Sequence, residues 1–383
     1  MVESVNSGVF FGESSLDELG CRLDAGEHHS ILLVTGRSSY ETSGASRLLA
    51  PALNGRQVTR VFDFQTNPQK SDLLRVLDEI KGVDFSAIIA VGGGSVMDVA
   101  KLIKCFAQAN EQIDEVLYSA SDATPSSVAL FAIPTTAGSG SEATQFAVLY
   151  DRGTKYSVTH PKLLPDAAWV LPSLLSSVPQ NIAAAAAMDS FCQGVESYWS
   201  IHSTDKSKEL ARQAICLSWD FMLPAVVDRD QAALEAMGEA AHLAGMAINL
   251  TKTTAAHSLS YALTAYFGLA HGHAVGLMLP DIYQYNEGVE NDDILDLRGV
   301  GYVKRVMVEI ALMLGHRSVQ DAAEAIRERM KNLGMPNSLN AVGITDPTQR
   351  ELLIEHGFNP DRVNNNPRKL STQELRSILT VTS

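Results

Sequence analysis

The chain has 383 residues, of which 45% are hydrophobic and 19% charged, and this is the balance of a globular protein large enough for two domains. Its net charge of −14 argues against nucleic acid as the main partner, because that binding depends on clustered Lys and Arg. We find no apolar run long enough for a bilayer and no export signal, so we expect a cytoplasmic protein with no membrane partner. The four cysteines are scattered and are expected to be buried free thiols.

Short β-rich runs alternate with amphipathic stretches in the first half of the chain. The predicted helices cover 69–81 and 95–107, and their apolar residues recur at helical spacing. Strand followed by helix, repeated, predicts a mostly parallel sheet with helices on both faces. The predicted strands are 30–36, 58–64, 85–93 and 127–135.

The pattern changes from about residue 174 onward. Segments rich in Ala, Leu and Met, such as 206–227 and 232–250, have helical spacing and replace the β-branched runs. Prolines and serines interrupt both patterns between Pro172 and Pro179. We therefore predict an α/β domain over 1–176 and an all-α domain over 177–383.

A glycine-rich loop follows the third predicted strand. In "AVGGGSVMDVAK", Gly92, Gly93 and Gly94 precede a helix that carries Ser95 and Asp98. Glycine lets the backbone approach a ligand, and the N–H groups at a helix start favour an anion such as pyrophosphate. The letters match neither the G-x-G-x-x-G nor the Walker pattern, and a tight turn in any α/β domain would look the same.

A second loop of small residues follows the next predicted strand. It reads "PTTAGSGSEAT" and carries Thr135, Thr136 and Ser139. Two such loops at the ends of neighbouring parallel strands predict a ligand-binding cleft.

The first predicted strand ends in "VTGRSS". Many nucleotide-binding folds place an acidic residue near this point to hold the ribose 2′-hydroxyl. Gly36, Arg37 and Ser38 instead leave room and positive charge for a 2′-phosphate, which favours NADP(H) over NAD(H). The alternative is a surface turn with a solvated arginine.

An alanine-rich segment, 183–200, is predicted to be helical. Asp189 and Gln193 lie four positions apart in it and therefore share one face of the helix. The pair would be half of a metal site if the second residue were a histidine, but glutamine is a far poorer ligand.

Three histidines lie within the apolar segment 251–280, which follows the predicted helix over 232–250. A lone histidine there would be a hydrogen-bonded core residue, but His257, His271 and His273 occur together. With Asp189 they predict a ligand set, because one carboxylate and two imidazoles suit Fe²⁺ or Zn²⁺ with open positions for a substrate.

Several motifs together identify a resemblance to the iron-containing (group III) alcohol dehydrogenase family. The resemblance covers almost the whole chain and implies a dehydroquinate-synthase-like fold. It further implies an N-terminal dinucleotide-binding domain, a helical C-terminal domain, a divalent metal between them and a homodimer. The motifs, which agree in order and spacing, are "GGGSVMDVAK", "PTTAGSGSEAT", "KYSVTHPKLLPDAAWVLPSLLSSVP", "MDSFCQGVESYWS", "AHGHAVGLMLP" and "NNNPRKLS".

The resemblance assigns metal ligands residue by residue. It matches the family's carboxylate to Asp189 and two of its histidines to His257 and His271. The family's first metal histidine corresponds to Gln193, and a histidine often credited with proton relay corresponds to Tyr261. Gln193 could bind the metal weakly, bridge through water or leave a metal-poor site, so we expect weak or replaceable metal binding. The alternative is a metal-free site in which Asp189 and Gln193 hydrogen-bond each other or the cofactor.

The segment "NLTKTTAAHSLSY" suggests the substrate. Lys252, Thr253, Thr254 and Ser258 flank His257, and a lysine beside hydroxyl groups can clamp an oxyanion. Solvated loop polarity is the alternative. Together with "HGHAVGLMLP" and "ESYWSIHST", the stretch "TKTTAAHSLSYALT" most resembles the phosphonoacetaldehyde reductase branch of the family, which implies NAD(P)H-dependent reduction of a short anionic aldehyde.

Further roles follow from the same resemblance. The nicotinamide is expected near Asp98, Thr135 and Lys155, and a bound Fe²⁺ or Zn²⁺ is expected to act as a Lewis acid. His273 and Tyr261 are the groups expected to return a proton to the alkoxide, with His273 favoured because its pKa is better matched.

Other functions stay open at this point. They are a different aldehyde or alcohol dehydrogenase of the family, a lyase resembling sugar-phosphate cyclases, and a catalytically silent NADP-binding protein. Net consumption of NADPH with an aldehyde distinguishes a reductase from the last two.

Overall fold

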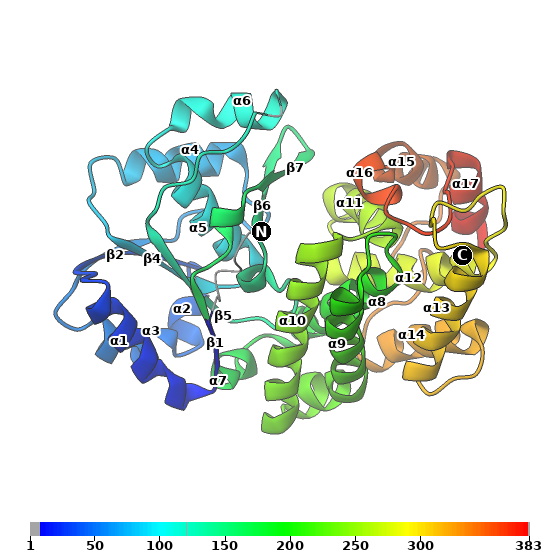
Figure 1. Ribbon diagram of the computed structural model, residues 1–383, viewed down its shortest axis with the longest axis horizontal. Coiled ribbons are helices and arrows are strands. Elements are labelled where there is room, and N and C mark those ends of the chain that lie inside the picture. The colour runs from blue at the N-terminus through cyan, green and yellow to red at the C-terminus, as the bar shows by residue number, and fades with distance from the viewer. Residues whose placement is uncertain (1–7, 120, 382–383) are drawn as a thin grey trace. The chain divides into compact units, whose positions relative to one another are not determined.

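The computed structural model describes residues 8–119 and 121–381, which form two compact units (Figure 1). The division between the units falls after Val178, and the sequence predicts it after residue 176. The first unit is α/β and the second is helical, as the sequence predicts.

A six-stranded parallel sheet forms the centre of the first unit. In spatial order its strands are β1 (Gly8–Phe11), β8 (Ala167–Val170), β5 (Ala129–Pro134), β4 (Ala87–Gly92), β2 (Ser30–Thr35) and β3 (Gln57–Val61). The four predicted strands are confirmed, although β3 ends before Phe62. The sequence misses β1 and β8, because a run of only four residues gives too short a pattern.

Helices cover both faces of this sheet (Figure 1). They are α1 (Leu16–Ala25), α2 (Ser39–Thr42), α3 (Ala45–Leu53), α4 (Lys70–Glu79), α5 (Gly94–Phe106), α6 (Ile113–Tyr118) and α7 (Pro172–Ser176). Leu32 and Val34 of β2 belong to the core with α4 and α5. Ile31 and Leu33, which point the other way, belong to the core with α1 and α3. The continuous apolar run of this strand is therefore buried on both sides.

An antiparallel hairpin, which the sequence analysis misses, follows the second small-residue loop. It joins β6 (Phe146–Asp151) to β7 (Thr154–Thr159) through Arg152 and Gly153. Both turn residues have positive φ, 50° and 80°, as a two-residue hairpin turn of the type I′ class requires. The dipeptide Arg-Gly between two β-rich runs is the signal that could have revealed it.

Within residues 179–381, which the structure describes in the second unit, the named elements are all helices, and loops join them. Helices α9 and α10 confirm the predictions at 206–227 and 232–250. Its helices are α8 (Gln180–Trp199), α9 (Asp205–Leu223), α10 (Gln231–Thr251), α11 (Ala255–Phe267), α12 (His271–Glu287), α13 (Val300–Met313), α14 (Val319–Asn332), α15 (Pro347–Gly357), α16 (Pro360–Val363) and α17 (Thr372–Val381).

One helical segment, Asp205–Asp228, is long and apolar enough by composition to cross a bilayer, which corrects our sequence-based exclusion of any such run. The segment packs against α8 and α10. Core helices of soluble proteins pass the same test, so the finding is weak support for a membrane span.

The cysteines are all free, as predicted. Cys105 and Cys192 are buried, Cys216 is partly buried, and Cys21 is exposed, which corrects the expectation for that residue.

A close approach of two helices positions the residues discussed below. A Cβ added at Gly272 of α12 would lie 1.9 Å from the carbonyl oxygen of Ala185 in α8 and 2.7 Å from Asp189 Cβ. Only glycine allows α12 to lie this near α8. The neighbouring His271 is thereby brought to the carboxylate of Asp189.

We predict that Gly272→Ala destabilises the protein by about 3 kcal/mol, because α12 must move away from the α8 backbone. Thermal or urea unfolding of the metal-free protein measures this. The control is Gly301→Ala in α13, where an added Cβ meets nothing within 4 Å. That variant should be unchanged or more stable by up to about 1 kcal/mol. Equal stability of the two variants would contradict the account.

Candidate active site

The sheet of the first unit contains a topological switch point. Strands β2 and β4 are neighbours, and the chain leaves β2 toward β3 on one side but leaves β4 toward β5 on the other side. In open parallel sheets, ligands bind outside the carboxyl ends of the strands at such a point. The predicted loops after β2 and β4 therefore lie side by side where a nucleotide is expected.

The two small-residue loops also contact each other. Thr135 N donates a hydrogen bond to Gly92 O at 3.0 Å. A Cβ on Gly93 would lie 3.2 Å from Thr136 Oγ1, and one on Gly94 would lie 3.0 Å from Ser139 Oγ. Both glycines are therefore needed for the close approach of the loops, whatever the ligand.

Ser95, Asp98 and Lys155 lie around the same loops. Ser95 Oγ accepts a hydrogen bond from Asn67 N at 3.1 Å, which ties the loop before α4 to the start of α5. Burial raises the pKa of Asp98 to about 6, although the charges of Lys101 and Lys155 act in the opposite direction. Lys155 is thus close enough to Asp98 to act on it electrostatically.

The turn after β2 is held by arginines. Arg37 pairs with Asp63, and Arg60 of β3 donates to the carbonyl oxygens of Gly36 and Arg37, each at 3.3 Å. A Cβ at Gly36 would lie 2.1 Å from Ser39 Oγ, so a side chain there would require the Ser39 hydroxyl to turn away. Sequence analysis identified Arg37 but not Arg60.

In the second unit, three predicted ligands converge. Nitrogen or carboxylate atoms of Asp189, His257 and His271 all lie within 4.8 Å of one another. Asp189 Oδ1 is 3.3 Å from His257 Nε2 and 3.9 Å from His271 Nε2. Asp189 and His257 are buried, and the His271 side chain is 34% exposed, which leaves one side open to a ligand.

The buried atoms of this cluster need a cation. Within the described part of the chain, neither Asp189 Oδ1 nor His257 Nε2 makes a well-formed hydrogen bond, although both are buried. Burial alone would lower the pKa of His257, but Glu196 and Asp189 raise it to about 10. Burial alone would raise the pKa of Asp189, but His271 and His257 outweigh it and lower the pKa. The potential of two buried carboxylates favours positive charge between them. A divalent cation fits this donor set.

Gln193 lies one turn after Asp189 on α8 and is buried at 4% exposure. Its side chain hydrogen-bonds Asp189 and helps to lower the pKa of that carboxyl. This is the contact expected if the pair shares a helix face. An amide provides neither the charge nor the softer nitrogen of the family's histidine, so it favours a harder ion.

Glu196 is the residue that sequence analysis missed. Its Oε1 accepts hydrogen bonds from Thr254 Oγ1 at 2.7 Å, Ala256 N at 2.9 Å and His257 N at 3.2 Å. Its Oε2 accepts from His257 Nδ1. A carboxylate can only accept, so Nδ1 carries the proton and Nε2 is left facing Asp189. The signal was available, because Glu196 follows Asp189 by two helical turns.

The segment before His257 is held by hydrogen bonds from α8 and from Asn365. Trp199 Nε1 donates to Thr254 Oγ1 at 2.9 Å, and Asn365 Nδ2 donates to Thr253 O at 3.0 Å. Lys252 caps α10 and is exposed. Ser258 is used structurally, since its Oγ donates to Gly357 O at 2.6 Å.

Two residues were predicted for proton return. The ring of Tyr261 stacks on His271, with centroids 6.4 Å apart, so Tyr261 borders the ligand set. His273 Nε2 donates instead to Pro336 O at 2.6 Å, and burial lowers its pKa. Both roles stay predictions, but the observed contacts favour Tyr261 over His273, opposite to the sequence-based preference.

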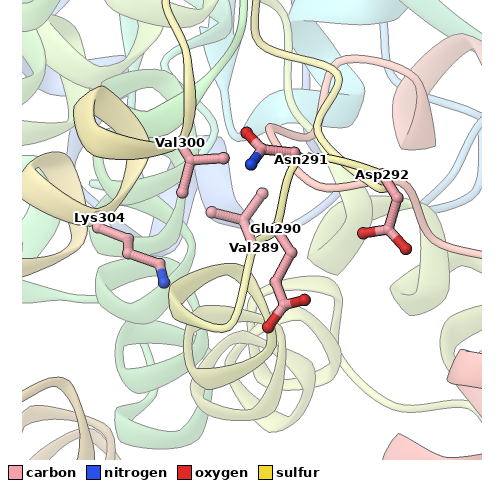
Figure 2. Close-up of a pocket in the computed structure, with 6 residues that line it drawn as sticks. All are labelled: Val289, Glu290, Asn291, Asp292, Val300 and Lys304. Atoms are coloured by element: carbon pink, nitrogen blue, oxygen red, sulfur yellow. The ribbon is translucent and has the colours of Figure 1, made fainter.

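A polar pocket lies elsewhere in the second unit and includes no predicted site residue (Figure 2). It is lined by Val289, Glu290, Asn291, Asp292, Val300 and Lys304.

Comparison with known proteins matches both units. Residues 6–172 match the family model of iron-containing alcohol dehydrogenases, and residues 183–382 match the C-terminal model of the same family. The chain belongs to the iron-containing alcohol dehydrogenase family. This family implies a nicotinamide cofactor and a divalent metal, and it makes the chain an enzyme of the alcohol dehydrogenase and aldehyde reductase class.

Individual relatives share this class. The phosphonoacetaldehyde reductase of Streptomyces viridochromogenes is 35% identical over 333 residues, covering 83% of this chain and 81% of that protein. An alcohol dehydrogenase of Thermococcus barophilus is 27% identical, covering 98% of this chain and 97% of the relative. The structure of sulfoacetaldehyde reductase from Bifidobacterium kashiwanohense in complex with NAD+ is 28% identical, with a TM-score of 0.88 and coverage of 98% and 96%.

We predict that Glu196→Gln weakens binding of Zn²⁺ by about 10- to 100-fold. The amide has one acceptor oxygen, which satisfies the three donors around Oε1 and turns the NH₂ group toward His257 Nδ1. The imidazole then carries its proton on Nε2, where the metal would bind. Calorimetric titration of the metal-free protein with Zn²⁺ measures the change.

The matched control is Glu309→Gln, since Glu309 accepts from Tyr198 of the same helix at 2.8 Å. It should bind Zn²⁺ like the wild type. Unchanged affinity in Glu196→Gln, with the protein folded, would show that Glu196 does not fix the tautomer.

Proposed function

We propose that this enzyme reduces a short aldehyde bearing a phosphonate or sulfonate group to the alcohol, with NADPH as reductant. The observation that carries the proposal is the backbone of Lys252, which has φ 58° and ψ 177° in the segment that leads to the candidate ligand His257. Two relatives with anionic-aldehyde names support the substrate class.

The conformation of Lys252 is one that glycine adopts readily and other residues rarely do, at a cost of about 1–3 kcal/mol. Such strain persists only where the surroundings fix it. Thr251 Oγ1 pairs with Ser197 Oγ at 2.8 Å, and Ser200 Oγ donates to Thr251 O at 3.3 Å. On the other side, Thr254 Oγ1 donates to Glu196, the partner of His257. Strained residues cluster at ligand sites, and here the strained residue carries an ammonium group.

The charge of Lys252 suits the proposed substrate. Its side chain is exposed, in a segment anchored to the helix that carries Asp189. An exposed ammonium with three donors can bind the tetrahedral oxyanion of a phosphonate or sulfonate. A neutral aldehyde would gain nothing from it.

Other residues hold the reacting groups. Asp189, His257 and His271 would hold the divalent ion, with Gln193 beside them. A divalent ion held there would supply Lewis-acid chemistry toward the aldehyde carbonyl, and a bound nicotinamide cofactor would supply the hydride. Glu196 fixes the His257 imidazole, and the Tyr261 hydroxyl is the proposed proton donor to the product oxygen.

The cofactor preference is part of the proposal. The turn after β2 has a glycine where an acidic residue would bind a free ribose 2′-hydroxyl, and two arginines adjoin it. This supports NADPH over NADH. The expected homodimer and cytoplasmic location stay predictions.

We predict that Lys252→Ala raises KM for phosphonoacetaldehyde about tenfold or more, because a charge-assisted contact is lost. KM for acetaldehyde should change by less than about threefold. Lys252→Arg, which keeps the charge, is the control and should lose less. Equal increases in KM for both aldehydes would sink the proposed anion site.

We also predict that Lys252→Gly raises KM for phosphonoacetaldehyde as Lys252→Ala does. Its free energy of unfolding should be about 1 kcal/mol higher than that of Lys252→Ala, because glycine relieves the strained backbone. Urea unfolding of the two variants side by side measures this difference. A less stable glycine variant would contradict the argument from strain.

The proton donor is tested by comparing Tyr261→Phe with His273→Gln. With Tyr261 as donor, the phenylalanine variant should lose at least about 100-fold in kcat. His273→Gln should retain most activity, since His273 bonds Pro336. The opposite pattern would restore His273 to the role first predicted for it.

A further inference from the structure

An unusual concentration of arginines surrounds the turn after β2 in a chain with a net charge of −14. Arg37 pairs with Asp63, Arg75 also lies near Asp63 at 3.4 Å, and Arg60 reaches the turn from β3. Arg37 and Arg60 lie at the carboxyl ends of two neighbouring strands, β2 and β3, whereas Arg75 comes from α4.

Arg60 is held by hydrogen bonds and by two aromatic rings. Its Nε donates to Thr35 Oγ1 at 2.9 Å, and its Nη2 donates to Gly36 O and Arg37 O at 3.3 Å each. Its guanidinium carbon lies 4.6 Å from the ring centroid of Tyr40 and 4.9 Å from that of Phe62. Hydrogen bonds and aromatic rings together fix the plane of the guanidinium.

One end of this guanidinium can be released to a ligand. A guanidinium has five N–H donors. The contacts of Arg60 use one on Nε, two on Nη2 and one on Nη1, where Glu41 Oε1 lies at 3.4 Å. The Glu41 side chain is 59% exposed, so this ion pair is weak and its carboxylate can turn into solvent. Both Nη1 donors then become available.

Arg37 is less suited to this task. Its side chain is 69% exposed and pairs with Asp63, itself 49% exposed. A solvated arginine loses more side-chain entropy when it binds a ligand than one already held by several contacts.

We propose that Arg60 is the specificity-determining residue that binds the 2′-phosphate of NADP(H), with Glu41 as the group that the phosphate displaces. A phosphate that takes the place of the Glu41 carboxylate would accept the two Nη1 donors while Nε and Nη2 still hold the turn. The inference rests on the proposed use of NADPH and adds the residue that recognises it.

Binding of 2′,5′-ADP and 5′-AMP tests Arg60 without turnover. These two nucleotides differ by the 2′-phosphate, so their affinity ratio isolates its contribution. We expect calorimetric titration of the wild type to favour 2′,5′-ADP, and Arg60→Gln to reduce that preference about tenfold or more. Arg60→Lys, which keeps the charge but has no planar fork, should reduce it partly.

A merely structural role predicts something different. If Arg60 only supports the turn, Arg60→Gln weakens 5′-AMP and 2′,5′-ADP by equal factors, and the inference fails. Thermal unfolding confirms that the variants are folded, and Arg22→Gln, at an exposed ion pair with Glu18 on α1, controls for loss of one positive charge. It should leave the ratio unchanged.

The Glu41→Gln variant, at an exposed position, tests the displacement of Glu41 independently. Removing the competing carboxylate should tighten 2′,5′-ADP about threefold or more while 5′-AMP stays the same. No change, or an equal change for both nucleotides, would contradict the displacement of Glu41.

The two proposals fail separately. If the wild type oxidises neither NADPH nor NADH with an anionic aldehyde, the proposed function is wrong, yet the nucleotide titrations still test Arg60. If the aldehyde is reduced but Arg60→Gln leaves the affinity ratio unchanged, only this inference is wrong.

Discussion

The hydrogen bonds of Glu196 are the interaction on which the rest of the candidate site depends. A single buried carboxylate accepts from the ring of His257, from two backbone amides at the start of α11 and from Thr254. It therefore joins α8, which carries Asp189, to the segment that carries His257. The same contacts hold the turn in which Lys252 adopts its strained backbone.

Charge explains why this arrangement suits a cation. Asp189 and Glu196 are both buried, with exposures of 6% and 0%, and His257 lies between them. Buried carboxylates are costly unless positive charge is near, so the site suits a metal ion better than an apolar ligand. Gln193 does not change the net charge of the site, because the family's histidine would bind the metal as a neutral ligand. The substitution changes the softness and strength of one contact and keeps the electrostatic reason for binding.

Sequence reasoning located much of this. The alternation of strands and helices is enough to predict β2, β4 and β5, because both faces of a parallel sheet must be apolar. The sequence predicts a ligand set because a cluster of histidines in an apolar segment requires polar partners. The family resemblance then indicates which residues bind the metal, namely Asp189, His257 and His271. The loops after β2 and β4 could be placed together once a parallel sheet was predicted.

The remainder depends on contacts that no local pattern encodes. Glu196 reads as an ordinary helical glutamate until the start of α11 is seen against it. Arg60 lies in a β-rich run, and its meeting with Gly36 depends on the pairing of β2 with β3. By chemistry alone His273 is a better-matched acid than Tyr261, and its hydrogen bond to Pro336 O becomes visible only in the structure. Short strands such as β1 and β8 are defined by their pairing with each other, and a run of four residues is too short for its pattern to predict a strand.

One measurement tests the central claim, that a metal site containing Gln193 serves reduction of an anionic aldehyde. Metal content is determined by mass spectrometry on protein purified without chelators, and NADPH oxidation with phosphonoacetaldehyde is followed before chelation, after it and after replacement of Fe²⁺ or Zn²⁺. The account predicts about one metal ion per chain, loss of turnover on chelation and recovery on replacement. Full turnover by metal-free protein would contradict it and would assign polarisation of the carbonyl to the protein's own side chains.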